Sequence, residues 1–98
     1  MRAVGYTTAA RYDIVNAADF YNSESPPSAR RFIEDVDETA ALLLEFPAIG
    51  QRYRRGTHRF RLKGFPYFLY YVILSDGIRI TAVAHQAQHP ARWDDRLR

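Results

Sequence analysis

The stretch "YFLYYVILSDGIRITAVAH", residues 67–85, decides the fold. Its opening run, Tyr67 to Leu74, is entirely apolar or aromatic and has the length of a central strand that is covered on both faces. Asp76 and Gly77 then give a strong signal for a two-residue hairpin turn. The run from Ile78 to His85 places Ile and Ala on one side, which predicts a second strand antiparallel to the first.

Another strand is predicted upstream, in the hexapeptide "HRFRLK" from His58 to Lys63. Phe60 and Leu62 point to one side of it, because successive side chains of a strand face opposite sides of a sheet. The other side carries cations, and these are Arg59, Arg61 and Lys63.

The positions of the turns predict how these strands align. A turn at Asp76–Gly77 sets the last register, with predicted pairs of Leu74 with Arg79, Ile73 with Ile80, Tyr71 with Ala82 and Phe68 with His85. A turn at Gly64–Phe65 sets the preceding one, with predicted pairs of Arg61 with Phe68 and Arg59 with Tyr70.

This alignment sorts the strand residues onto two faces. The apolar face is expected to form the core, and it collects Phe60, Leu62, Leu69, Tyr71, Ile73, Ile80, Ala82 and Ala84. The opposite face has basic side chains around an apolar centre, and it collects Arg59, Arg61, Lys63, Arg79 and His85 around Phe68, Tyr70, Val72 and Val83. The second face is too apolar to be simply solvated, which suggests a contact surface.

The N-terminal half predicts a short strand and a helical hairpin. Arg2 to Tyr6 reads as the strand, and Thr7 or Thr8 can cap a helix that runs to about Tyr21. The cluster from Asn22 to Ser28 is rich in turn residues.

A second helix follows, marked by an apolar stripe of Ala29, Phe32, Ile33, Val36, Ala40, Leu43 and Leu44. Its acidic residues Glu34, Asp35, Asp37 and Glu38 are expected on the outer face, and Pro47 ends the helix.

The composition is that of one globular domain over residues 1–98, with 47% hydrophobic residues, 26% charged residues and a net charge of +3. The absence of Cys excludes disulfides and favours a cytoplasmic location. The sequence has no apolar run typical of a signal peptide or a membrane span, and its His residues lack neighbours at metal-ligand spacing. We therefore expect no membrane association, metal or cofactor.

Together the elements predict an α+β domain of order β-α-α-β-β-β, with the helical hairpin packed on one face of an antiparallel sheet. This order resembles the RelE/ParE superfamily of bacterial toxins, and the segments "FPAIGQRYR" (46–54), "HRFRLKGFPYFLYYVI" (58–73) and "ITAVAHQAQHPARW" (80–93) are similar too. The resemblance is strongest to the ParE-like branch, because of two features. These are the tripeptide Phe65-Pro66-Tyr67, which leads into the central strand, and the C-terminal residues His85, Pro90 and Trp93.

The resemblance implies the toxin of a type II toxin–antitoxin system. Its partner would be a ParD-like antitoxin that folds a helical and an extended segment against it. ParE-type relatives inhibit DNA gyrase, whereas RelE-type relatives cleave mRNA on the ribosome. We favour the gyrase-binding toxin, which needs no catalytic residue.

Two surfaces are expected to bind partners. The basic face of the sheet contributes Arg59, Arg61, Lys63, Phe68, Tyr70, Val72 and Arg79. An acidic, amphipathic segment would satisfy it, with carboxylates on the cations and apolar side chains on the aromatics. Tyr12 and Val15 on the first helix are expected at a groove for an antitoxin helix.

The alternative is a metal-independent, ribosome-dependent mRNA endonuclease. Arg61 and Arg79 would hold the phosphate and His85 would transfer a proton. Two departures from the superfamily pattern weigh against this activity, since no Tyr follows Tyr71 and Ala87-Gln88 stand where relatives often carry basic residues.

A third interpretation is a stand-alone domain that stacks single-stranded RNA on Phe68 and Tyr70. It is the weakest of the three, because no recognisable RNA-binding motif flanks these residues.

Overall fold

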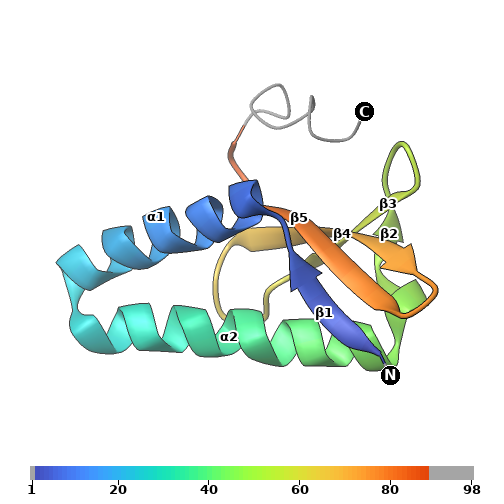
Figure 1. Cartoon of the computed structure of the whole chain (residues 1–98). Coiled ribbons are helices and arrows are strands. Elements are labelled where there is room, and N and C mark those ends of the chain that lie inside the picture. The colour runs from blue at the N-terminus through green and yellow to red at the C-terminus, as the bar shows by residue number, and fades with distance from the viewer. Residues whose placement is uncertain (1, 89–98) are drawn as a thin grey trace.

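The computed structural model describes residues 2–88, in which two helices lie against one face of a five-stranded sheet (Figure 1). The elements are β1 (Ala3–Tyr6), α1 (Thr8–Glu24), α2 (Pro26–Glu45), the 3-10 helix η1 (Pro47–Ile49), β2 (Gln51–Arg52), β3 (Thr57–Arg61), β4 (Tyr67–Leu74) and β5 (Gly77–His85). The predicted α+β class is confirmed. Pro90 and Trp93, which contributed to the resemblance, lie outside the described residues.

The strands lie in the order β1-β5-β4-β3-β2. β1 pairs with β5 in parallel, and the other neighbours are antiparallel, so the sheet is mixed rather than antiparallel throughout. The two-residue strand β2 was not predicted, because two residues are too few to show the alternation of a strand.

The helices are longer, and the turn between them shorter, than predicted. Only Ser25 separates α1 from α2, and it serves both of them. Its N–H donates to the carbonyl of Tyr21 at 2.9 Å, and its hydroxyl accepts from the N–H of Ser28 at 3.3 Å. Pro26 fits the first turn of α2 because a proline there loses no helical hydrogen bond.

The predicted register between β3 and β4 is confirmed, with Arg61 opposite Phe68 and Arg59 opposite Tyr70. The predicted register between β4 and β5 is wrong, because the turn residues are Ser75 and Asp76.

Gly77 is a strand residue that pairs with Leu74 on one side and Ala3 on the other. Its φ is 149°, and a Cβ there would overlap the backbone of Ala3. The glycine is therefore needed for the close approach of β1 as well as for its own backbone conformation.

A β-bulge at Thr81 then reverses the faces to which the side chains of Ala82 to His85 point. Tyr71 pairs with Ile80 but Tyr70 pairs with Ala82, so Thr81 is an extra residue. Beyond this point Val83 joins the core under the helices, whereas Ala82 packs on the other face of the sheet. The predicted faces of Ala82, Ala84, Val83 and His85 are therefore inverted.

The bulge lies where β1 ends and α1 begins. The hydroxyl of Thr7, the N-cap of α1, donates to the carbonyl of Thr81 at 3.3 Å, and the N–H of Thr7 donates to the carbonyl of Ile80 at 3.0 Å. One turn into α1, a carboxylate oxygen of Asp13 accepts from the N–H of Val83 at 2.9 Å. These contacts fix α1 to the edge of β5 that β1 leaves free.

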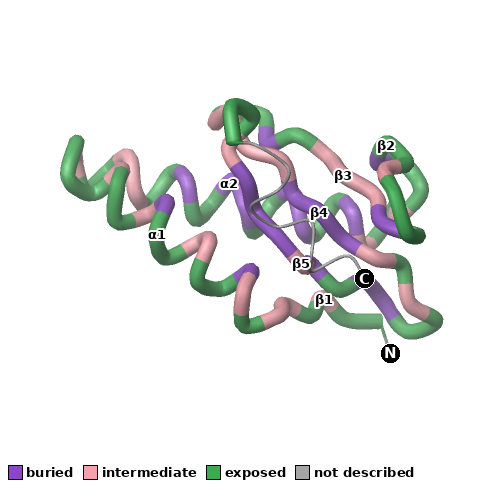
Figure 2. Tube along the Cα trace, turned by 90° about the horizontal axis from the view of Figure 1, so that it is seen from above, coloured by how far each residue is buried: buried purple, intermediate pink, exposed green. Residues whose placement is uncertain are grey.

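The core fills the space between the helices and the sheet. Figure 2 shows the buried positions concentrated along the central strands and on the inner sides of the helices. The main cluster consists of Ala10, Ala17, Phe32, Val36, Ala40, Leu43, Leu62, Leu69, Tyr71, Ile78, Ile80 and Val83. All of the helix α2 residues in it belong to the predicted apolar stripe.

Asp35 on α2 is 4% exposed and not on the outer face as predicted. One carboxylate oxygen accepts from the N–H of Gly64 at 2.8 Å, and the other accepts from the hydroxyl of Thr39 at 3.3 Å. Asp35 thus ties the loop between β3 and β4 to the middle of α2. Just after the C-terminus of α2, the carbonyl of Pro47 accepts from the hydroxyl of Tyr71 at 2.6 Å.

We predict that Asp35→Ala lowers the free energy of unfolding by about 1–3 kcal/mol, because it leaves the N–H of Gly64 without an acceptor. For a domain of this size, each kcal/mol corresponds to about 4–8 °C in Tm. Thermal unfolding followed by circular dichroism measures the loss. Glu34→Ala, at the exposed neighbouring position, is the control, and an equal loss in both variants would contradict the prediction.

Candidate partner-binding surfaces

The sheet face turned away from the helices, here called the helix-free face, has an apolar centre with basic side chains around it. Tyr70, Ala82 and Ala84 form a second small cluster, with Tyr53 and Phe68 packed against it. Tyr70 is only 3% exposed, and the ring of Tyr53 meets it edge-on at 5.2 Å between centroids. The centre of this face is thus a packed aromatic cluster and less open than the sequence predicted.

Arg59 binds this cluster through its guanidinium, which lies 4.6 Å from the centre of the Phe68 ring and 5.3 Å from that of Tyr53. Its Nε donates to the side-chain oxygen of Gln51 at 3.0 Å. The cation therefore holds β2, β3 and β4 together on the helix-free face. Arg61, two positions further along β3, is exposed and donates to the carbonyl of Leu62 at 3.3 Å.

Lys63 does not share this face, contrary to the prediction. β3 ends at Arg61, and the ammonium of Lys63 reaches a carboxylate oxygen of Glu38 on α2 at 2.7 Å. The hydrogen bond and the charge of Glu38 raise the pKa of Lys63. The row of cations in "HRFRLK" is therefore divided between the two sides of the molecule.

The residues proposed for RNA cleavage are not brought together. Arg61 lies opposite Phe68 and Arg79 opposite Val72, which separates them by four positions, about 13 Å, along β4. His85 pairs with Tyr67 beyond the bulge and lines a pocket with Asp13 and Phe20 of α1. The imidazole therefore lies on the helix side of the sheet, away from both arginines.

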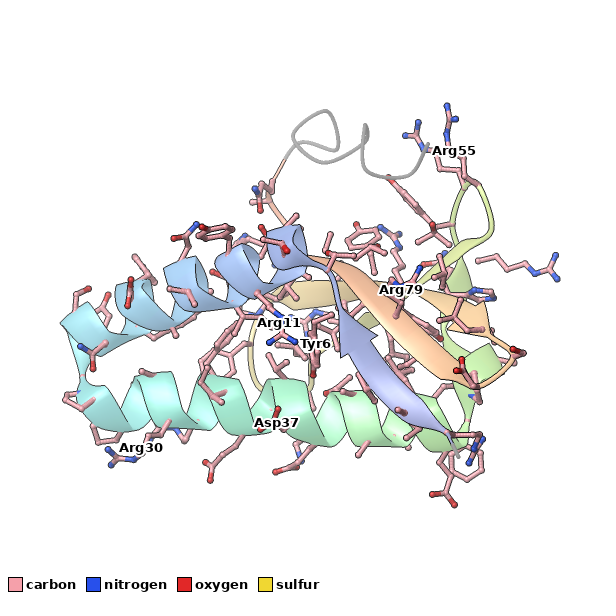
Figure 3. The ribbon with its side chains drawn as sticks, viewed as in Figure 1. Tyr6, Arg11, Arg30, Asp37, Arg55 and Arg79 are labelled. Atoms are coloured by element: carbon pink, nitrogen blue, oxygen red, sulfur yellow. The ribbon has the colours of Figure 1, made fainter. Side chains whose placement is uncertain are left out.

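A groove of about 260 Å³ opens between β1 and the two helices, lined by Tyr6, Arg11, Ile14, Val15, Ile33, Val36 and Asp37. We call it the helix groove. Figure 3 shows Tyr6, Arg11 and Asp37 gathered in it, with the guanidinium of Arg11 5.6 Å from the centre of the Tyr6 ring. Burial and the charge of Asp37 raise the pKa of Tyr6, and Arg11 counteracts this.

The surface of α1 beside the helix groove exposes apolar side chains. Tyr12 is 66% exposed and Val15 is 53% exposed, so both side chains are accessible to a partner. The sequence predicted a groove at Tyr12 and Val15, but Tyr12 does not line it, and the remaining lining from β1, α1 and α2 was not predicted because it depends on how these elements pack. Val15, at its mouth, was the one lining residue that sequence reasoning selected.

Among residues 2–88 there is no group of three His, Asp or Glu residues placed to hold a metal ion. Within the same range, neither helix combines the length and apolar character needed to cross a bilayer.

The sequence matches, over residues 4–90, the family described as the ParE toxin of the type II toxin–antitoxin system parDE. The chain belongs to this family of toxins. A solved structure, described as the chromosomal ParDE toxin–antitoxin system from P. aeruginosa, has a similar fold with a TM-score of 0.75 and 19% sequence identity. The similarity covers 87% of this chain and 96% of the other. No curated protein gives a significant match to the sequence.

We predict that Arg59→Ala destabilises the β2–β3 hairpin, because it removes two ring contacts and the bond to Gln51. The expected cost is about 1–2 kcal/mol, at about 0.5–1 kcal/mol per cation–π contact. Arg61→Ala on the same strand and face is the matched control and should stay within about 0.5 kcal/mol of wild type. Urea denaturation measures both, and an equal cost would contradict the role assigned to Arg59.

Proposed function

We propose that this toxin is neutralised by a ParD-like antitoxin and acts by binding DNA gyrase in the cytoplasm. The observation that carries the proposal is the family match over residues 4–90, whose description names the parDE system. The arrangement of side chains supports a toxin that works by binding, because the three candidates for an RNA-cleaving centre lie on different faces and at different levels of the sheet.

The helix groove and the adjoining surface of α1 fit a helical antitoxin segment. Tyr12 and Val15 stand one turn apart on α1, so the apolar side chains of an amphipathic helix can pack on both. Arg11 and Asp37 border the apolar lining with opposite charges, which would orient the bound helix.

The helix-free face fits an extended acidic segment. Arg61 and Arg79 are exposed and can pair with carboxylates, while Phe68 and Val72 between them are partly buried and offer apolar contacts. Tyr70 and Lys63, which the sequence also placed in this surface, are already engaged by Tyr53 and Glu38 respectively. We therefore assign the partner contacts to the outer residues of this face.

We predict that Val15→Glu raises the Kd for the antitoxin by at least roughly 5- to 150-fold, since leaving even a neutral polar group unpaired in an apolar contact costs about 1–3 kcal/mol and a carboxylate costs more. Leu42→Glu is the matched control, because Leu42 is also an exposed apolar residue, at 41%, but lies on α2 outside the groove lining. Biolayer interferometry with the purified pair measures the Kd. Equal weakening by both variants would contradict a site on α1.

The choice of target is tested by adding the purified toxin to two assays. We expect inhibition of the supercoiling activity of DNA gyrase and intact mRNA on translating ribosomes. The antitoxin should restore supercoiling when it is added in equal amount. Cleaved mRNA together with unchanged gyrase activity would refute the proposed target and favour the RelE-type activity.

A further inference from the structure

Charge is segregated between the two halves of the chain. The residues from 51 to 75 contain no Asp or Glu but six cations, which are Arg52, Arg54, Arg55, Arg59, Arg61 and Lys63. The two helices carry three cations and eight carboxylates, namely Arg11, Arg30 and Arg31 against Asp13, Asp19, Glu24, Glu34, Asp35, Asp37, Glu38 and Glu45. Lys63 pairs with Glu38 of α2, so the hairpin itself, residues 51–61, carries five arginines and no carboxylate.

The tip of this hairpin is built from a turn that arginine does not favour. The N–H of Thr57 donates to the carbonyl of Arg54 at 3.1 Å, which closes a turn around Arg55 and Gly56. Both central residues have positive φ, 58° for Arg55 and 72° for Gly56. Two positive φ angles define a type I′ turn, in which Asn or Asp is the preferred partner of the glycine. Arg55 thus occupies a position that its backbone preference disfavours.

The tip is nevertheless held firmly. The N–H of Tyr53 donates to the carbonyl of Thr57 at 2.9 Å, and the Tyr53 ring packs against Tyr70 on the sheet. Arg54 lies 5.4 Å from the centre of the same ring. Figure 3 shows Arg55 at the outer end of the hairpin, pointing away from the sheet, with Arg30 at the far end of the molecule on α2.

We propose that the hairpin tip, Arg52 to Gly56, binds the phosphate backbone of double-stranded DNA. The tip presents arginines without an exposed apolar side chain, whereas protein interfaces depend on buried aromatic or aliphatic anchors. The Tyr53 ring packs edge-on against Tyr70, and Arg59 lies against the rings of Tyr53 and Phe68, so both rings are partly occupied and poorly placed to stack on a single-stranded base. Charge alone recognises phosphates without reading sequence.

The probe is a fluorescein-labelled 20-base-pair duplex, and anisotropy with the purified full chain gives the Kd at 50 and 200 mM NaCl. The ratio of the Kd at 200 mM NaCl to the Kd at 50 mM NaCl measures how strongly binding depends on salt, and each phosphate contact should raise this ratio about 3.5-fold. Arg55→Asn should therefore lower the ratio about 3.5-fold, whereas Arg55→Lys, which keeps the charge, should retain it. Arg30→Gln removes a distant charge and should also leave the ratio unchanged.

Arg55→Asn also separates binding from folding, because Asn suits the left-handed backbone better than Arg. Its Tm should equal or exceed that of wild type while DNA binding weakens. The proposal is overturned if the wild-type chain does not bind the duplex at 50 mM NaCl, if Arg55→Asn and Arg30→Gln change the ratio equally, or if Arg55→Asn weakens antitoxin binding but not DNA binding. Neither antitoxin nor gyrase enters the DNA assay, so its result is independent of the function proposed above.

Discussion

The extra residue at Thr81 is the constraint on which the rest of the structure depends. β5 must pair with the short parallel strand β1 up to Ile80 and then accept the start of α1 against the same edge. Without the bulge, the strand would turn Val83 away from the helices and leave Ala82 to fill the core beneath them. Thr81 is held from both sides, since its carbonyl accepts from the hydroxyl of Thr7 and its own hydroxyl donates to the carbonyl of Tyr70.

The same shift determines the chemistry of the two surfaces. Ala82 and Ala84 on the helix-free face are small and leave room for the large rings of Tyr70 and Phe68. The Tyr70 ring contacts Tyr53, and the guanidinium of Arg59 lies between the rings of Tyr53 and Phe68. His85 is moved to the pocket beside α1. The face that resembles a phosphate site in the sequence is therefore a structural aromatic cluster with cations at its margins.

The elements with strong periodicity could be predicted from the sequence, including the whole of β4 and the apolar stripe of α2. The bulge could not, because "IRITAVAH" alternates without a glycine or any other local mark at residue 81. Gly77 misled the prediction of the turn, since a glycine required by the approach of β1 has the same appearance as one required by a turn. The face of Lys63 was predicted wrongly because β3 ends at Arg61. Beyond the end of a strand, side chains no longer alternate between the two faces of the sheet.

The contact of Asp13 with β5 has a consequence for how the free toxin behaves in solution. Among residues 2–88, no strand pairs with the edge of β5 beyond β1, and such an edge is a template onto which a second chain can add. The side chain of Asp13 occupies the N–H of Val83, and that of Gln88 occupies the N–H of His85. These polar side chains compete with an incoming strand for the two N–H groups, and the carboxylate adds a charge that such a strand would have to desolvate, so strand addition along this edge is disfavoured.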